Sequence, residues 1–328
     1  MSLYQASRSF GAATLIAATA MLGACGGGGS GSSSSASSNV LKLSTAVQSE
    51  PVAKYAGAVG ILAGPGVAAI YTSVVQSLVT GVTSSAANGT KVCPTSGSIS
   101  IGTQSAGNTG LQSGETATVS FNQCMGQVSA PGVSASAAIT GSMTVQVQNA
   151  QGTVGSSTAN WSYTAVETAN ALTLTSSNGT TVLNGTVTYT MSYDAATGVT
   201  TTTATAPTIT LGIAQAVASG NVDGTITITA LTYSRIHGTD PTSDTVSTSG
   251  AISVQASDAE IAFNVATPAP VVVSDGNVEG GEIQLSSDNT VENITAASTS
   301  SVNISVTSNG QTGTYTETVA SLRALTGS

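Results

Sequence analysis

The stretch Gly185-Thr186-Val187-Thr188-Tyr189-Thr190-Met191-Ser192-Tyr193 indicates the fold of this chain, because its side chains alternate between two kinds. In an extended strand, Val187, Tyr189, Met191 and Tyr193 share one face, and the hydroxyl side chains share the other. A strand of this kind buries one face and solvates the other. That pattern is typical of an antiparallel sheet.

The same alternation recurs through most of the chain beyond residue 95. It appears in the runs 117–121, 139–147, 209–213, 261–265 and 302–306. Dipeptides that favour tight hairpin turns lie between such runs, at Asn178-Gly179, Asp275-Gly276 and Asn309-Gly310. We therefore expect a mainly β fold with one large antiparallel sheet of roughly 12 to 15 strands.

A short unit, a glycine followed by alternating residues, recurs along this region. It begins at Gly97, Gly141, Gly185, Gly224, Gly250 and, more loosely, Gly281. The intervals of 44, 44, 39, 26 and 31 residues are too irregular for the rungs of a β-helix. We expect long meandering strands that start or bend at a glycine.

One apolar face per strand leaves two architectures open. The first is a sandwich or closed barrel. The second is a strongly curved open sheet, a half-barrel, whose concave face is covered by helices from residues 50–83. The second is similar in outline to lipoproteins that carry lipid in a half-barrel, which is an analogy of fold alone. A transmembrane barrel is disfavoured, because Leu and aromatic residues are too few for a lipid-facing band.

Residues 40–85 show the periodicity of a small helical hairpin. Its clearer stripe repeats at i, i+3, i+4 and i+7 and comprises Val67, Ile70, Tyr71, Val74, Val75, Leu78, Val79 and Val82. Gly64-Pro65-Gly66 separates it from an earlier, weaker stripe. We expect the hairpin to pack against the sheet. Strands remain an alternative, because β-branched residues are poor helix formers, and so does a helix in the membrane interface.

The run Leu22-Gly23-Ala24-Cys25 follows a short apolar segment and resembles the lipobox of bacterial lipoproteins. The resemblance implies that residues 1–24 are a signal peptide and that Cys25 is the lipid attachment site, carrying acyl chains such as palmitate. Residues 25–39 then form the lipidated cysteine and a flexible Gly/Ser tether, and residues 86–328 the β domain. Gly26 in place of an acidic residue favours the outer membrane, on its periplasmic or surface face.

If Cys25 is acylated, Cys93 and Cys124 form an even pair in an oxidising compartment, so we expect a disulfide between them. The formal net charge of −9 leaves no basic patch, which argues against a nucleic-acid partner. The membrane, reached through the acyl chains on Cys25, is the expected partner. No catalytic, dinucleotide or metalloprotease motif occurs in the sequence, and we expect no cofactor and no metal.

Two weaker candidates come from polar residues. His237 lies in a turn-like stretch and is more simply a solvated loop residue than a catalytic one. Five acids, Asp240, Asp244, Asp275, Glu279 and Glu282, could offer oxygen ligands to Ca²⁺, although their spacing matches no calcium loop. Solvated turn carboxylates are the favoured interpretation.

The expected function is a non-enzymatic binding or structural role at the envelope, with an apolar ligand or lipid held between sheet and helices. An adhesin or scaffold at the cell surface is the first alternative. A hydrolase whose acids meet only in the folded chain is the second.

Overall fold

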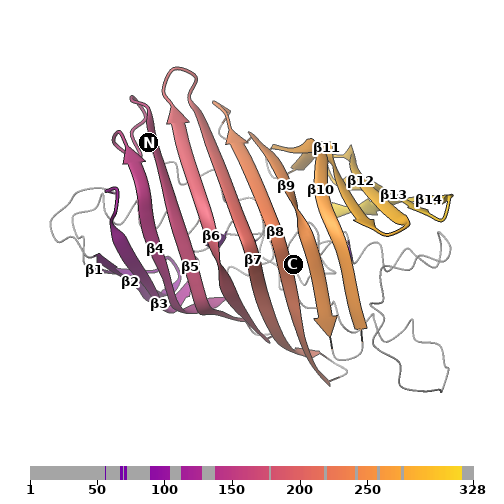
Figure 1. Ribbon diagram of the computed structural model, residues 1–328, viewed down its shortest axis with the longest axis horizontal. Helices are drawn as coiled ribbons and strands as arrows, with labels where there is room; N and C mark the ends of the chain where they lie inside the picture. The colour runs from indigo at the N-terminus through magenta and orange to yellow at the C-terminus, as the bar shows by residue number, and fades with distance from the viewer. Residues whose placement is uncertain are drawn as a thin grey trace.

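Fourteen antiparallel strands form one sheet in the computed structural model, and their order in the sheet is their order in the chain (Figure 1). The structure describes residues 56, 67–68, 70–71, 89–103, 112–127, 137–176, 179–217, 220–240, 243–256, 259–274 and 277–319. The strands are Gly89–Val92 (β1), Ser96–Thr103 (β2), Thr116–Met125 (β3), Ala138–Gln151 (β4), Trp161–Ser176 (β5), Gly179–Asp194 (β6), Val199–Val217 (β7), Gly220–His237 (β8), Ser243–Ala256 (β9), Ala259–Ser274 (β10), Asn277–Ser287 (β11), Thr290–Ser298 (β12), Ser301–Ser308 (β13) and Gln311–Thr318 (β14).

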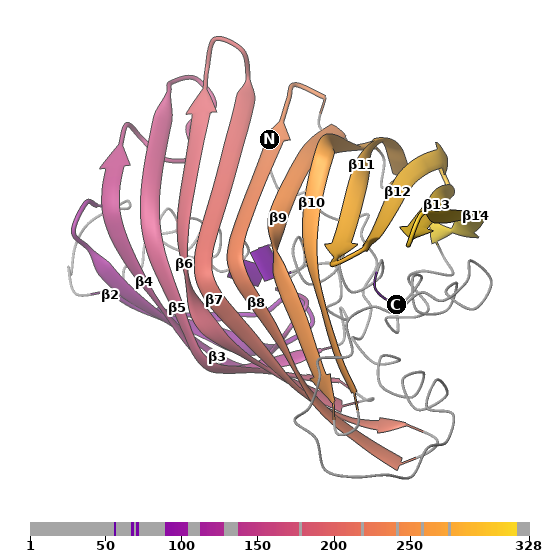
Figure 2. The ribbon, with the colours of Figure 1, turned by 45° about the vertical axis from the view of Figure 1, so that its right-hand side comes forward.

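The sheet is open and curved. Each strand pairs with the next one in sequence, and β1 and β14 stand at the two ends of the strand order without pairing to each other. Figure 2 shows the strands bending around a common interior. The predicted antiparallel sheet and its strand number are confirmed, and of the two architectures left open, the curved open sheet is the one that forms in the described part of the chain.

The inner face of the sheet is apolar because the period-two alternation continues from strand to strand. On β6, Val187 and Tyr189 are buried while Thr188 is exposed. On the neighbouring β5, Tyr163 and Ala165 are buried at the same level. These side chains belong to one continuous core that extends from β2 to β13. Burying a Val, Leu, Ile or Phe side chain stabilises the fold by about 1.5–3 kcal/mol, so this face drives folding.

The bending of the sheet follows from the repeated glycines. At five of the six repeated glycines, the pairing with a neighbouring strand shifts its register. The exception is Gly224, which pairs regularly with Ile213 and Ala256. These five glycines and the residues beside them on the neighbouring strands form a row across the sheet, which we call the bend line. Its members are Gly97, Gln123, Gly141, Ala171, Gly185, Thr208, Ala230, Gly250, Pro270 and Gly281. A bulge bends its strand and increases the local twist, so a row of bulges across β2 to β11 curves the sheet.

Gly185 shows why glycine is needed on the bend line. Its φ is 143°, and a Cβ atom there would lie 2.9 Å from the Thr208 carbonyl oxygen of β7. The register between β6 and β7 shifts at this point, where β7 carries an extra residue. Any larger residue at position 185 would therefore push the two strands apart and straighten the sheet.

Residues from the N-terminal part of the chain lie on the inner face. Ala56, Val67, Ala68, Ile70 and Tyr71 have helical backbone and belong to the same core as the sheet. Figure 2 shows this helical segment inside the curve. The remainder of the predicted hairpin, 40–85, lies outside the described residues, as do the signal peptide, Cys25 and the tether, so those parts remain predictions.

Candidate functional site

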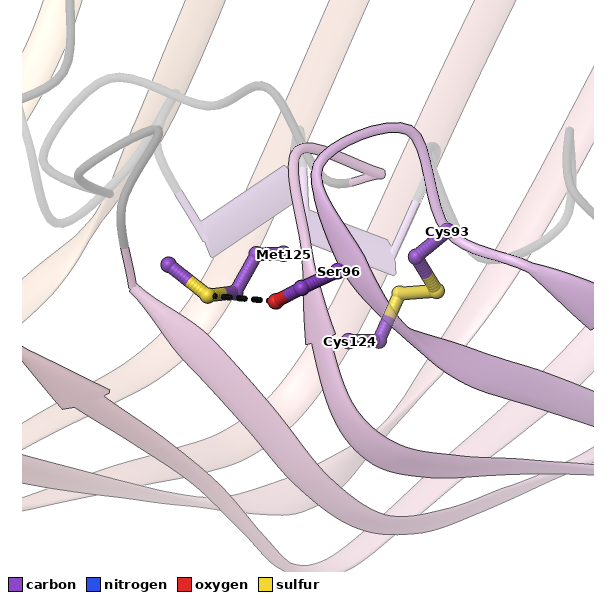
Figure 3. The surroundings of a disulfide bond; sticks show 4 residues. All are labelled: Cys93, Ser96, Cys124 and Met125. Carbon is purple, nitrogen blue, oxygen red and sulfur yellow. Dashed lines mark hydrogen bonds between the residues drawn. A yellow bond between two sulfur atoms is a disulfide. The ribbon is translucent and has the colours of Figure 1, made fainter.

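The disulfide predicted between Cys93 and Cys124 is present in the structure (Figure 3). Their Cα atoms are 5.5 Å apart, and 31 residues of sequence separate them. Both side chains are buried, and Cys124 follows the bulged residue Gln123 on β3. Beside the disulfide, the Ser96 hydroxyl donates a hydrogen bond to the Met125 sulfur at 2.8 Å. The bond stabilises the first hairpins of the sheet, and cysteine chemistry at this pair is structural.

A glutamate lies in the middle of the apolar inner face. Glu167 stands on β5 between Ala165 and Ala169, and its cross-strand neighbours are Val145 on β4 and Val187 on β6. Its side chain is 0% exposed, and neither carboxyl oxygen has a hydrogen-bond partner. Burial raises the pKa of Glu167 well above its usual value, because an apolar environment disfavours the charged carboxylate.

Two tyrosines from different parts of the chain interact electrostatically with Glu167. Tyr71 comes from the N-terminal helical segment, and its hydroxyl donates a hydrogen bond to the Gly185 carbonyl at 2.9 Å. Tyr163 lies on β5 itself. Burial and then the charge of Glu167 raise the pKa of Tyr71. Burial, the neighbouring Tyr189 and Glu167 raise the pKa of Tyr163. Both phenols therefore remain protonated, and the Tyr163 hydroxyl donates a hydrogen bond to the Met191 sulfur at 3.5 Å.

A second buried glutamate occupies an equivalent position near the other end of the sheet. Glu292 on β12 is 0% exposed and pairs across strands with Leu285 and Val306. Neither of its carboxyl oxygens has a hydrogen-bond partner, and burial raises its pKa well above the usual value.

An aromatic cluster extends from Glu167 toward the β4–β5 loop. Trp161 stacks on Tyr163 and on Tyr193, with ring centroids 6.1 and 6.0 Å apart. The Trp161 indole nitrogen donates to the Ser156 carbonyl at 2.8 Å, and the Tyr193 hydroxyl donates to the Ser157 carbonyl at 3.1 Å. These polar contacts hold the loop over the end of the sheet, so the cluster is structural.

His237 lies at the end of β8, and not in the turn that its sequence surroundings suggest. It pairs with Thr200 on β7 and with Asp244 on β9. Asp244 Oδ1 accepts a hydrogen bond from Arg235 Nε at 2.8 Å and lies 3.0 Å from His237 Nδ1. Burial lowers the pKa of Arg235, but the hydrogen bond and charge of Asp244 outweigh burial and raise it. The three side chains form a half-buried ionic cluster at one rim of the inner face.

The acids considered for Ca²⁺ are dispersed in the structure. Asp244 is engaged by Arg235 and His237, Asp240 lies in the turn that follows β8, and Glu279 and Glu282 stand on β11. Asp275 lies outside the described residues. In the described ranges, no three His, Cys, Asp or Glu side chains are placed to hold one metal ion.

Comparisons with protein-family models, with curated proteins and with solved structures gave no match. Within the part of the chain that the structure describes, no helix is long and apolar enough to span a bilayer. The candidate site therefore rests on the geometry of this chain alone.

Sequence reasoning missed Glu167 and Glu292, although a signal for both was present. Each stands at an inward position of an alternating run, Glu167 between Ala165 and Ala169, and Glu292 two residues before Ile294. A charged residue where the alternation calls for an apolar one indicates a buried charge. The acids considered from the sequence were instead those between Asp240 and Glu282, which were expected in turns.

Proposed function

We propose that the protein is a lipid-anchored lipoprotein of the bacterial cell envelope whose β domain binds an apolar ligand between the sheet and the N-terminal helical segment. The observation that carries the proposal is the covering of the inner face. This apolar face is covered by single residues such as Ile70 and Tyr71, from a segment that is not a strand of the sheet. Such a segment can separate from the face without breaking any hydrogen bond of the sheet ladder.

Both polar and apolar contacts hold the described residues of that segment. The Tyr71 hydroxyl donates a hydrogen bond to the Gly185 carbonyl, and one hydrogen bond contributes about 0.5–1.5 kcal/mol to stability. Ile70 and Tyr71 also add apolar contact with the core. An apolar ligand offers the inner face the same kind of contact and can replace part of the segment there.

Saturable binding of an apolar fluorescent probe, Nile red, tests this function. The full chain carrying Cys25→Ser is used, so that its own acyl chains do not compete. We expect binding to the parent, a severalfold loss in Ala169→Leu, which fills the inner face, and no loss in Thr168→Leu, the adjacent exposed position. Absence of saturable binding, or an equal loss in both variants, contradicts the proposal.

The anchor is proposed from the lipobox alone. Two or three acyl chains on Cys25 would hold the protein stably on the membrane, where one chain would not. Growth with a palmitate analogue should label the wild-type protein, and Cys25→Ser should abolish the label. Continued labelling of the serine variant would refute acylation at Cys25.

A surface adhesin or scaffold is the second candidate, and the outer face of the sheet favours it. Threonines face each other across strands there and hydrogen-bond in pairs, as in Thr164–Thr190 at 3.1 Å and Thr168–Thr186 at 3.0 Å. This rigid, uncharged hydroxyl surface suits contact with another surface. Protease treatment of intact cells distinguishes the two, because an adhesin must be cleaved and a periplasmic carrier must not.

We infer a non-enzymatic role in either case. His237, the one histidine in the sequence, is held by Asp244, and that carboxylate also binds Arg235. Both carboxyl groups with strongly raised pKa, Glu167 and Glu292, lie seven strands apart in the sheet order. The hydrolase alternative has the weakest support.

A further inference from the structure

The Glu167 carboxyl is buried without a group that neutralises it. Both oxygens lack a hydrogen-bond partner, and the side chain stands among Val145, Val187 and two alanines. The cationic side chains that the structure describes are accounted for elsewhere: Lys91 lies on the exposed strand β1, and Arg235 is bound to Asp244. Among the residues that the structure describes, the inner face thus carries an acid and no base beside it.

Such a group is costly to the folded protein. A buried polar atom without a partner destabilises the folded state, and an unpaired buried charge destabilises it more. A glutamine or an apolar residue at this position would stabilise the fold. An unsatisfied buried polar group in a native protein requires an explanation, and a bound water, ion or ligand that supplies its partner is one.

The surroundings of Glu167 point to the chemistry of that partner. The Glu167 charge acts on Tyr71 and Tyr163, whose hydroxyls donate to the Gly185 carbonyl and the Met191 sulfur and keep oxygen lone pairs that can accept. A primary ammonium has three N–H donors, which one carboxylate and two phenol oxygens can accept. A ligand with a carboxylate head would instead place a second acid beside Glu167, and an alcohol would offer a hydrogen bond but no positive charge.

We propose that Glu167 is the polar anchor of the ligand site and that the ligand is an apolar chain ending in a primary ammonium group. This inference rests on the proposed function and adds the class of ligand to it. The acidic net charge of −9 attracts a cationic amphiphile to the protein and disfavours an anionic one. Tyr71, held on Gly185, covers the anchor and accepts from the bound ammonium.

Binding of the ammonium ligand is expected to release a proton from Glu167. In the free protein, burial among apolar side chains favours the protonated form of Glu167. When the ammonium arrives with its own positive charge, the carboxyl loses its proton to solvent and becomes the counter-ion. No other bond forms or breaks, so about one proton is released for each ligand bound.

Three amphiphiles with the same chain test the inference on the full chain carrying Cys25→Ser: dodecylamine, dodecanol and dodecanoate, each below its micellar concentration. Equilibrium dialysis gives the affinities, and calorimetry in buffers of different ionisation enthalpy gives the proton release. We expect the amine to bind at least about tenfold more tightly than the alcohol, with about one proton released, and dodecanoate to bind most weakly.

Glu167→Gln should reduce amine binding to the level of the alcohol and abolish the proton release. Glu292→Gln is the matched control, since it removes a second buried acid whose carboxyl oxygens have no hydrogen-bond partner, seven strands away in the sheet, and should leave both readings unchanged. Circular dichroism confirms that both variants are folded. An equal loss of amine binding in the two variants would show that the amine is attracted to acidic groups in general, and it would overturn the inference.

The possible failures are distinguishable. If amine and alcohol bind equally, the inference about Glu167 is wrong while ligand binding at the inner face stands. If none of the three binds, the proposed function itself is wrong. If dodecanoate binds most tightly, the anchor is a cation, and Glu167 does not select the ligand.

Discussion

The hydroxyl of Tyr71 donates a hydrogen bond to the carbonyl oxygen of Gly185 at 2.9 Å, across 114 residues of sequence. The contact joins the N-terminal helical segment to the bend line of the sheet. Ala169 on β5 pairs with Gly185 on β6, so Glu167, two residues before Ala169, lies close to the same point. The bend of the sheet at Gly185 and the buried carboxyl of Glu167 thus lie close together on the inner face.

Tyr71→Phe should weaken the covering of the inner face. The change removes one hydrogen bond and leaves the Gly185 carbonyl without its donor, which costs about 1–3 kcal/mol. Urea unfolding measures the loss. Tyr193→Phe is the control, because its hydroxyl contacts the exposed Ser157 carbonyl, and water can replace that contact. A cost for Tyr71→Phe no greater than that for Tyr193→Phe would contradict the importance of this contact.

Gly185→Ala should destabilise the bend line. Alanine at φ 143° is strained, and its Cβ would lie 2.9 Å from the Thr208 carbonyl oxygen and 3.1 Å from the Ile209 Cα atom. We expect a loss of about 2 kcal/mol or more, in line with the cost of a strained backbone position. Gly212→Ala on β7 is the matched control, since the nearest atoms to its Cβ are 3.9 Å away. Similar losses of stability in the two variants would show that the bulge at Thr208 does not require glycine at position 185.

The stability of the protein should fall with rising pH through Glu167. Burial raises the pKa of this carboxyl in the folded chain above its unfolded value near 4.5. Between those two values the folded state binds more protons, so the free energy of unfolding decreases as pH rises, by at most about 1.4 kcal/mol per pH unit.

Glu167→Gln should remove that decrease and leave the protein more stable than the wild type at pH 7. Urea unfolding from pH 4 to pH 8 measures it, with the exposed Glu279→Gln as control. A wild-type profile that Glu167→Gln does not flatten would show that this carboxyl is not buried in solution.

Loss of the Cys93–Cys124 disulfide should destabilise the domain without abolishing the sheet. Closing a loop of 31 residues is worth roughly 3–4 kcal/mol in the chain-entropy model. The double serine variant should unfold at lower urea, and the oxidised wild type should contain no free thiol at these positions by alkylation and mass spectrometry. Alkylation of both cysteines without a reductant would refute the pairing.

The sheet was predictable from sequence because side-chain alternation is a local property. The run Gly185–Tyr193 shows period two without reference to any other strand, and the same holds for each neighbouring run. The position of a strand in the sheet is not local, but hairpin dipeptides between successive runs make a meander the simplest order. The predicted bending at glycines is likewise seen at Gly141 and Gly185.

The bulges and the buried acids were not predictable in the same way. Ala171 and Ala230 adopt positive φ without any sequence signal of their own, and only the glycine on the adjacent strand indicates that room is needed there. Whether Glu167 is solvated depends on which segment covers the inner face, and that segment lies far away in sequence. His237 was expected in a loop because Gly238 follows it, yet the pairing with β7 extends the strand to that residue.

Native mass spectrometry of the protein purified from its own membranes tests the central claim most directly, namely that the inner face of the half-barrel holds an apolar ligand. The account predicts a non-covalent adduct that survives transfer of the intact chain, is released on unfolding as an amine-bearing amphiphile, and is missing from Ala169→Leu but present in Thr168→Leu. A wild-type protein that carries only its covalent acyl chains, with no non-covalent adduct in any preparation, would contradict it.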